Sequence, residues 1–344
     1  MPNYFENIAQ CYVIAEIGVN HNGSIKLAKE MIRAAKKSGA DAVKFQTFSA
    51  ELLVTKATPK VQYQKLTTND DESHYQMIKS LELKKSDFEE LFNYCSDIDI
   101  DFISTPYDVS NTEFLNTLGV KFFKTASADI VDLQLHEFIA KTGKCAIVAT
   151  GMASLGEIET VVDIYDRYEN ENLVLLHCVS NYPCSDSSLN LKALDVIRTA
   201  FGKPVGFSDH SYGSLASALS IAFGSKVIEK HFTLDKGLPG PDHKASSTPD
   251  EFAILVADIR RAESMLGKSR KKRQNEEQQM ADVSRKSIVY KHDLILGHEI
   301  TIDDLTVMRP GNGFPPYMLS NFIGMRLTKD VVCKEQVKWG ELEE

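Results

Sequence analysis

Short apolar runs alternate with amphipathic stretches along most of the chain. The apolar runs are rich in β-branched and aromatic residues, which is typical of buried strands, and the stretches between them repeat their apolar positions with a helical period. The expected strands cover residues 12–17, 42–45, 101–104, 121–125, 146–150, 173–178, 205–208 and 226–231, and the clearest helices cover 25–39, 87–97, 155–168 and 191–202. Such a succession of strand–helix units predicts either a (β/α)8 TIM barrel or a doubly wound open sheet.

Polar residues stand at the carboxyl ends of the expected strands, and their placement favours the barrel. In a barrel all these ends converge on one face, where active sites lie, whereas in an open sheet they would spread along an edge. The pattern therefore predicts a (β/α)8 catalytic barrel over residues 1–267. The strand-end residues are Glu16, Lys44, Gln46, Ser104, Thr105, Lys124, Ser127, His177, Ser208, Asp209, His210, Glu229 and His231.

A polar, charge-dense stretch follows the barrel. Residues 268–286 lack a core-forming period and are expected to be a linker. The basic cluster at 268–273 would suit a nucleic-acid partner, but Glu276 and Glu277 follow at once, so a solvated helix end and linker is the better interpretation. Residues 287–344 combine short β runs with tight turns, and we expect this small domain to pack on another surface because its own core is marginal.

Composition and charge serve mainly to exclude classes of function. The net charge of −9 argues against nucleic acid as the main partner, although a local site can still bind an anionic substrate. No run approaches ~18 apolar residues, and no basic-then-apolar leader opens the sequence, so we expect no membrane association and a cytoplasmic location. The six cysteines are scattered without metal-binding spacing, which agrees with a reducing compartment.

Two histidines follow consecutive strands. His210 and His231 would lie at the ends of neighbours ~4.8 Å apart, so their imidazoles can share one divalent ion. Two independently hydrogen-bonded histidines are the alternative. Imidazole ligands suit manganese, iron, cobalt or zinc better than magnesium, and two protein ligands would leave open coordination positions for substrate or water.

Two lysines mark an expected anion pocket. Lys44 and Lys124 stand at inner strand ends, where a lysine is costly to bury unless it meets an anion. The alternative is that each lysine reaches solvent or pairs with Glu16 or Asp129. We favour a phosphate-and-carboxylate pocket because hydroxyl groups lie beside the lysines. These hydroxyls belong to Ser104, Thr105, Ser127 and Ser208.

Three acids are candidates for proton transfer or for binding hydroxyl groups: Glu16, Asp129 and Asp242. Ordinary ion pairing is the alternative for each. The Gly- and Pro-rich loop at 237–241 is expected to hold Asp242. The long polar segment 48–75 is either a lid or an insertion.

Eight phrases occur in an order that resembles a known family. They are AEIGVNHNGS (15–24), VKFQTF (43–48), STPYD (104–108), KTASADI (124–130), ATGMAS (149–154), GFSDHS (206–211), EKHFTLDKGLPGPDHKAS (229–246) and RPGNG (309–313). Together they closely resemble the bacterial sialic acid synthase family, which comprises N-acetylneuraminate synthase and its legionaminate and pseudaminate relatives. The resemblance extends over nearly the whole chain.

The resemblance implies a fold, a reaction and partners. It implies a TIM barrel joined to a C-terminal antifreeze-like (SAF) domain, in a domain-swapped homodimer whose SAF domains cover the partner's active site. The implied reaction condenses phosphoenolpyruvate with open-chain N-acetylmannosamine to give N-acetylneuraminate and phosphate. The alternative is a legionaminate or pseudaminate synthase that uses a 2,4-diacetamido-2,4,6-trideoxyhexose. The implied cofactor is a divalent metal on His210 and His231, Mn²⁺ first, with Mg²⁺ or Co²⁺ as alternatives.

The resemblance also assigns roles by matching position. The matched phosphoenolpyruvate contacts are Lys124, Ser127, Thr105 and Ser208. The matched sugar contacts are Gln46, Tyr182, Asn181, Asp242 and Arg309, the last reaching from the SAF domain to the N-acyl group. The matched catalytic groups are Glu16, Lys44, Asp129 and Asp242.

Three departures from the family pattern indicate a subfamily with a different sugar. Asp129 replaces a glutamate of many members and is one carbon shorter, which puts a direct role as a base in doubt. Ala149 replaces a serine, so one hydroxyl to phosphate is missing. The amide matched to Asn181 could instead fall at Ser180. A barrel that merely binds a sugar is the non-enzymatic alternative, but both histidines, both lysines and the acids are present.

Overall fold

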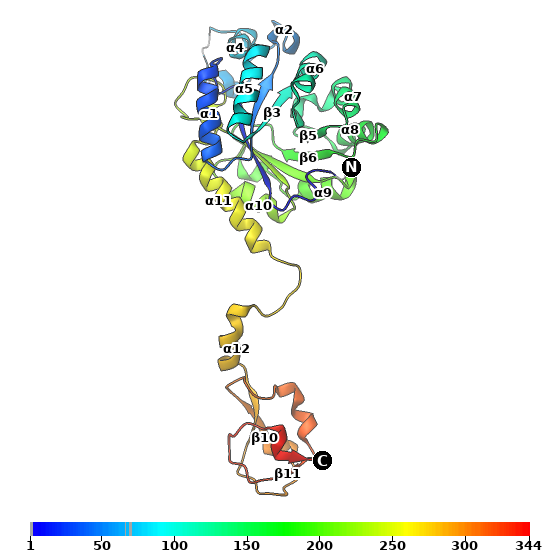
Figure 1. Ribbon diagram of the computed structural model, residues 1–344, viewed down its shortest axis with the longest axis vertical. Helices are drawn as coiled ribbons and strands as arrows, with labels where there is room; N and C mark the ends of the chain where they lie inside the picture. Colours follow the sequence, from blue (N-terminus) through cyan, green and yellow to red (C-terminus); the bar gives the residue numbers. More distant parts are fainter. Residues whose placement is uncertain (1–2, 66, 69–70) are drawn as a thin grey trace. The chain divides into compact units, whose positions relative to one another are not determined.

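The computed structural model describes residues 3–65, 67–68 and 71–344. The chain divides into two compact units, with the boundary between Gly267 and Lys268 (Figure 1). Each unit has an apolar core of its own. Among the described residues, no helix is both long and apolar enough to cross a membrane.

The first unit is a closed barrel of eight parallel strands in sequence order. Glu16 is in register with Lys44 on one side and with His231 on the other, so the first strand joins the second to the last. The predicted barrel is therefore confirmed, and the open-sheet alternative is wrong. The strands are β1 (Tyr12–Gly18), β2 (Ala42–Thr47), β3 (Asp101–Pro106), β4 (Phe122–Thr125), β5 (Cys145–Ala149), β6 (Leu173–Cys178), β7 (Val205–Asp209) and β8 (Val227–His231).

Helices alternate with these strands. Ser24 accepts a hydrogen bond from the backbone N–H of Leu27 and so caps the first helix. Three short helices, α2 (Ala50–Leu53), α3 (Gln62–Lys65) and α4 (His74–Leu81), separate β2 from α5, and the predicted lid or insertion at 48–75 lies partly outside the described residues. The other α-helices of the first unit are α1 (Ile25–Lys37), α5 (Lys85–Asp97), α6 (Val109–Leu118), α7 (Leu133–Lys141), α8 (Leu155–Arg167), α9 (Ala193–Phe201), α10 (Leu215–Ala222) and α11 (Pro249–Leu266).

The strand period of two explains how an apolar barrel carries a polar mouth. Side chains two apart along a strand share a face, so each strand contributes a short column to the barrel interior. Ile14 precedes Glu16 in one column, and Val227 precedes Glu229 in another; the first member of each pair belongs to a buried apolar cluster. Apolar layers therefore fill the lower barrel, and polar side chains follow at the carboxyl ends.

The second unit contains the α-helix α12 (Gln278–Ser284) and two small antiparallel sheets. The helix lies within the predicted linker. The sequence pattern did not predict this helix, because it has no buried residues. Its end is fixed instead by hydrogen bonds to its own carbonyl oxygens: the Gly311 N–H donates to Asp282 O at 2.7 Å, and the Arg309 side chain donates through Nε to Ser284 O at 2.9 Å. The strands are β9 (Ser287–Tyr290), β10 (Leu305–Met308), β11 (Arg326–Leu327) and β12 (Leu342–Glu343).

Candidate active site

A polar cavity lies at the carboxyl ends of the barrel strands, and most of the predicted site residues line it. It also includes residues from the loops after β3, β4 and β6, so distant parts of the sequence meet there. The lining residues are Glu16, Lys44, Gln46, Thr105, Tyr107, Lys124, Ala126, Ser127, Ala149, Tyr182, Ser208, His210, Glu229 and His231.

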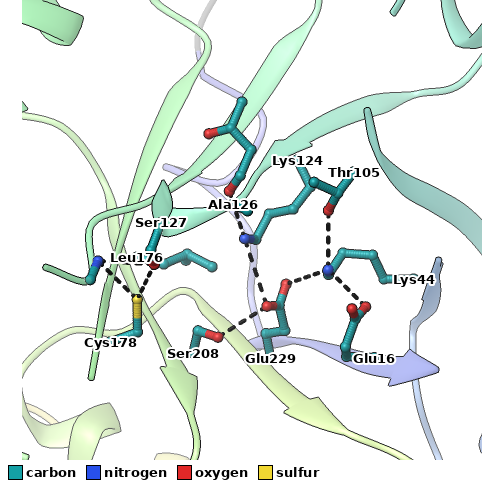
Figure 2. Close-up of polar contacts among 12 residues, drawn as sticks. Glu16, Lys44, Thr105, Lys124, Ala126, Ser127, Leu176, Cys178, Ser208 and Glu229 are labelled. Atoms are coloured by element: carbon teal, nitrogen blue, oxygen red, sulfur yellow. Dashed lines mark hydrogen bonds and ion pairs between the residues drawn. The ribbon is translucent and has the colours of Figure 1, made fainter. Parts of the chain in front are cut away.

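Four buried charges of alternating sign cross the cavity floor (Figure 2). Lys44 Nζ lies 2.7 Å from Glu16 Oε2 and 3.8 Å from Glu229 Oε2. Lys124 Nζ lies 3.7 Å from Glu229 Oε1. We call Glu16, Lys44, Glu229 and Lys124 the charge quartet; its formal charges cancel, which makes their joint burial tolerable.

The two acids of the quartet titrate differently. Burial raises the pKa of Glu16 to about 7, although Lys44 opposes the shift. Burial would also raise the pKa of Glu229, but Lys124 and Lys44 outweigh it and lower that pKa to about 2. Glu229 is therefore a fixed negative charge, whereas Glu16 can take up or release a proton near neutral pH.

Hydroxyl and N–H groups surround the lysines. Lys44 Nζ donates to Thr105 Oγ1 at 3.2 Å, and Ser208 Oγ donates to Glu229 Oε1 at 3.0 Å. The backbone N–H of Gly151 donates to Ser127 Oγ at 3.1 Å. These dipoles and the two ammonium groups can together replace the hydration of an anionic substrate.

The two predicted metal ligands face each other. The His210 and His231 rings are 5.7 Å apart between centroids, and the Tyr182 ring lies 4.2 Å from that of His210. Val179 O accepts from His210 Nδ1 at 2.8 Å, an assignment that leaves Nε2 with a lone pair. Burial lowers the pKa of both imidazoles, so they are neutral.

These histidines fit a metal ion as two ligands of an open site. His231 Nδ1 is buried without a hydrogen-bond partner, and a metal would satisfy such an orphaned atom. No cluster of three or more His, Cys, Asp or Glu side chains suited to a metal occurs in the described part of the chain. Water or substrate would therefore complete the coordination.

The remaining predicted residues lie outside the cavity lining. Asp129 Oδ2 accepts from the Ala126 N–H at 3.1 Å, so this carboxylate caps a turn. Asn181 is exposed and donates to Pro183 O at 3.0 Å. Asp242 is buried and close enough to Lys44 for its charge to contribute to raising the pKa of that lysine, after the larger effects of burial, Glu16 and Glu229. Arg309 belongs to the second unit.

Sequence reasoning placed Glu229 at a strand end but gave it no role. The period of two could have found it, because Glu229 and His231 share the inner face of β8. Lys230 points the other way and pairs with Asp209 at 3.0 Å. Tyr107 and Ala126, which also line the cavity, carried no comparable pattern.

The fold and the site define a class: a (β/α)8-barrel enzyme with a polar cavity at its mouth that holds two buried lysines. The NeuB family model matches residues 31–271, and the SAF domain model matches residues 285–343. The chain therefore belongs to the NeuB family and ends in a SAF domain, which confirms both the resemblance and the predicted fold. It is an enzyme of the synthases that join phosphoenolpyruvate to amino sugars by a new carbon–carbon bond.

Several known proteins are similar over nearly their whole lengths. N,N′-diacetyllegionaminic acid synthase of Legionella pneumophila is 43% identical over 337 residues, which are 97% of this chain and 95% of that protein. N-acetylneuraminate-9-phosphate synthase of Mus musculus is 35% identical over 95% of this chain and 93% of that protein. The crystal structure of the N-acetylneuraminic acid synthetase of Leptospira borgpetersenii superposes with a TM-score of 0.71 and 35% identity, over 80% of this chain and 93% of that one.

Proposed function

We propose that this protein condenses phosphoenolpyruvate with the open-chain form of an N-acylated amino sugar, giving a nonulosonic acid and phosphate. The charge quartet is the observation that carries the proposal. Lys124, Ser127 and Ser208 line the cavity together and would present one ammonium group and two hydroxyls to the anionic substrate. Lys44 Nζ donates a hydrogen bond to Thr105 Oγ1. Glu229 holds the ammonium groups apart and in place.

The proposed chemistry assigns a task to each side of the site. The C2–C3 π electrons of phosphoenolpyruvate form a bond from C3 to the sugar aldehyde carbon, and the carbonyl π pair moves to the aldehyde oxygen, which takes a proton. A water oxygen then bonds to C2 and loses a proton. The C2–O bond to phosphate finally breaks as the new C2 hydroxyl loses its proton and becomes the ketone. The water proton needs an acceptor, and Glu16, with a pKa raised by burial to about 7, can hold it. Gln46 Nε2 donates to Glu16 Oε1 at 3.0 Å and orients that carboxylate. Asp129 stays a predicted catalytic group, although its carboxylate caps Ala126 N.

A divalent ion on His210 and His231 belongs to the proposal, with Mn²⁺ favoured over Mg²⁺ or Co²⁺. When bound, it would polarise the sugar carbonyl. Chelation should abolish phosphate release, and added Mn²⁺ should restore it. The variant His210→Ala should lose Mn²⁺ in a direct titration while its thermal unfolding stays similar. Full turnover by exhaustively chelated, metal-free protein would contradict the metal's role.

For the sugar, we favour a 2,4-diacetamido-2,4,6-trideoxyhexose, which would make the product a legionaminate-type acid. The support comes from similarity: synthases named for N,N′-diacetyllegionaminic acid are 43% and 42% identical to this chain, against 35% for the mouse N-acetylneuraminate-9-phosphate synthase. N-acetylmannosamine is the second candidate, and the 35% identical Leptospira borgpetersenii structure supports it.

A side-by-side substrate panel tests this choice. Phosphate release with phosphoenolpyruvate would be measured for N-acetylmannosamine, its 6-phosphate and the 2,4-diacetamido-2,4,6-trideoxyhexoses of manno and altro configuration. We expect the highest kcat/KM with the diacetamido manno sugar. A higher kcat/KM with N-acetylmannosamine would replace the proposal by the second candidate.

We also propose a domain-swapped homodimer in which Arg309 serves the partner's active site. Its exposed guanidinium, held by one bond to Ser284 O, is available to a substrate outside its own unit. Equal amounts of the inactive variants Arg309→Ala and Lys124→Met, allowed to exchange subunits, should regain roughly a quarter of wild-type activity, because each mixed dimer contains one intact site. No regain in a mixture shown to exchange would contradict the swap.

A further inference from the structure

The turn after β1 and the loop after β8 are joined by three residues that the proposed chemistry leaves unused. They are Asn20, Asn22 and His243, and more than two hundred residues of sequence separate the first two from the third. His243 and Asn20 are fully buried. Asn22 bonds to Pro239 and Asn20 bonds to Ser246, and Asp242, the predicted sugar contact, lies between these two loop positions.

Asn22 holds the loop on the amino side of Asp242. Its Nδ2 donates to Pro239 O at 2.8 Å. The next residue, Gly240, has a φ of +145°, and a Cβ there would lie 2.9 Å from Asn22 Oδ1 and 2.8 Å from His243 Cδ2. Since only glycine fits this approach, the loop backbone rests directly on Asn22 and His243.

His243 links Asn22 to the end of the barrel. Its Nε2 faces Asn22 Oδ1 at 3.4 Å, and its Nδ1 lies 2.7 Å from Thr233 Oγ1. Because Asn22 Nδ2 is used on Pro239, the facing atom of Asn22 is an acceptor, so Nε2 donates. Nδ1 is then an acceptor that faces the Thr233 hydroxyl, whose one proton it shares with the Asp235 carbonyl oxygen at 3.1 Å. Burial lowers the pKa of His243 to about 4, which agrees with a neutral ring carrying one proton.

Asn20 holds the loop on the carboxyl side. Its Nδ2 donates to Ser246 Oγ at 2.9 Å and to Phe232 O at 2.9 Å. Ser246 Oγ in turn donates to the backbone oxygen of Asp242 at 2.7 Å. The backbone of Asp242 is thus fixed from both sides by residues of the β1 turn, and it is fixed to the strand that carries Glu16.

We infer that Asn20, Asn22 and His243 are positioning residues that set the Asp242 carboxylate against the amino sugar. The inference rests on the proposed function for the claim that Asp242 contacts the sugar, but not for the claim that the loop is held. It gives a role to the two asparagines of the NHN sequence at 20–22 and to the histidine beside Asp242.

Kinetics separate positioning from general damage. Asn22→Ala and His243→Ala should each lower kcat/KM for the sugar about tenfold while changing KM for phosphoenolpyruvate less than about twofold, since a displaced contact acts only on its own substrate. His243→Gln, which keeps a donor toward Asn22, should recover much of the loss. His136→Gln, at another fully buried histidine outside the site, is the control and should keep wild-type values. Asn22 is half-buried, so its variant keeps the test open if His243→Ala does not fold.

Hydrogen exchange tests, without turnover, whether Asn20, Asn22 and His243 hold the loop around Asp242; we call these three residues the clamp. The amides of Ala245 and Ser246 donate within the loop, and both should exchange about tenfold faster in Asn22→Ala than in wild type. Unchanged exchange, or an equal loss for both substrates, would overturn the inference. If exchange accelerates but Asp242→Asn leaves the sugar KM unaltered, the clamp stands and the sugar contact of the proposed function fails instead.

Discussion

At the scale of single residues, the site is governed by where charge is fixed and where it can move. Glu229 stays ionised because Lys124 and Lys44 both face it. Glu16 titrates near neutral pH because burial and the neighbouring charge of Glu229 outweigh the effect of Lys44 on its pKa. The site therefore contains one permanent negative charge, Glu229, that holds the two ammonium groups, and one acid, Glu16, that can take up or release a proton. Glu229 is therefore more important to the geometry than its lack of a direct role in the sequence analysis suggests.

Replacing Glu229 by glutamine tests whether its negative charge stabilises the two buried lysines. The amide can still accept from Ser208, but Lys124 and Lys44 lose their shared counter-charge. We expect unfolding by urea to show a loss of about 3 kcal/mol, as for other broken buried pairs. The control Glu251→Gln breaks a surface pair with Lys236 and should cost less than about 1 kcal/mol. Equal small losses in both variants would contradict the assignment.

At the scale of elements, the turn between β5 and α8 brings backbone rather than side chain to the site. A Cβ on Gly151 would lie 2.7 Å from Ser127 Oγ and 3.1 Å from Cys178 Sγ, and it would also collide with Ser180 Oγ. The close approach lets the Gly151 N–H reach Ser127 Oγ at 3.1 Å.

Gly151→Ala should therefore disturb phosphoenolpyruvate binding. We expect KM for phosphoenolpyruvate to rise about tenfold or more, because Ser127 must move away from the added methyl group. Gly156, on α8, has nothing within 4 Å of its Cβ position. Gly156→Ala should keep both KM values and raise stability by about 0.5–1 kcal/mol. An unchanged KM in Gly151→Ala would show that this turn does not serve the anion.

How much of the structure the sequence could predict depends on the range of each contact. The eight strands and the residues at their carboxyl ends were predictable because period and strand order act locally, and a closed barrel then gathers them. Glu229 was within reach of the same reasoning. The bonds from Asn20 and Asn22 to the loop near Asp242 were not, because no local pattern reports a contact across two hundred residues. Helix α12 escaped because no buried face marks it.

At the scale of the whole molecule, buried neutral histidines tie stability to pH. Burial lowers the pKa of His21, His136 and His243 to about 4 each, below the ordinary value of 6.5. Between these limits the unfolded chain binds more protons than the folded one, so stability falls as pH falls. Each histidine should contribute a slope of about 1.4 kcal/mol per pH unit near pH 5.

His136→Gln isolates one of these contributions. Urea unfolding measured from pH 7 to pH 4.5 should give a curve for the variant that is flatter than the wild-type curve by about 1.4 kcal/mol per unit. The difference should vanish above pH 7, where the histidine is neutral in both states. Parallel curves across the whole range would mean that His136 does not titrate differently in the folded protein.

If the charge quartet serves a condensation, phosphate leaves only when the sugar has bonded. The most direct test measures phosphate and nonulosonic acid in the same reaction, with Mn²⁺, phosphoenolpyruvate and the best sugar of the panel. Equal amounts of both products, no phosphate when the sugar is omitted, and no reaction by Lys124→Met are the predicted results. Phosphate released without sugar, or well in excess of the nonulosonic acid, would contradict the account.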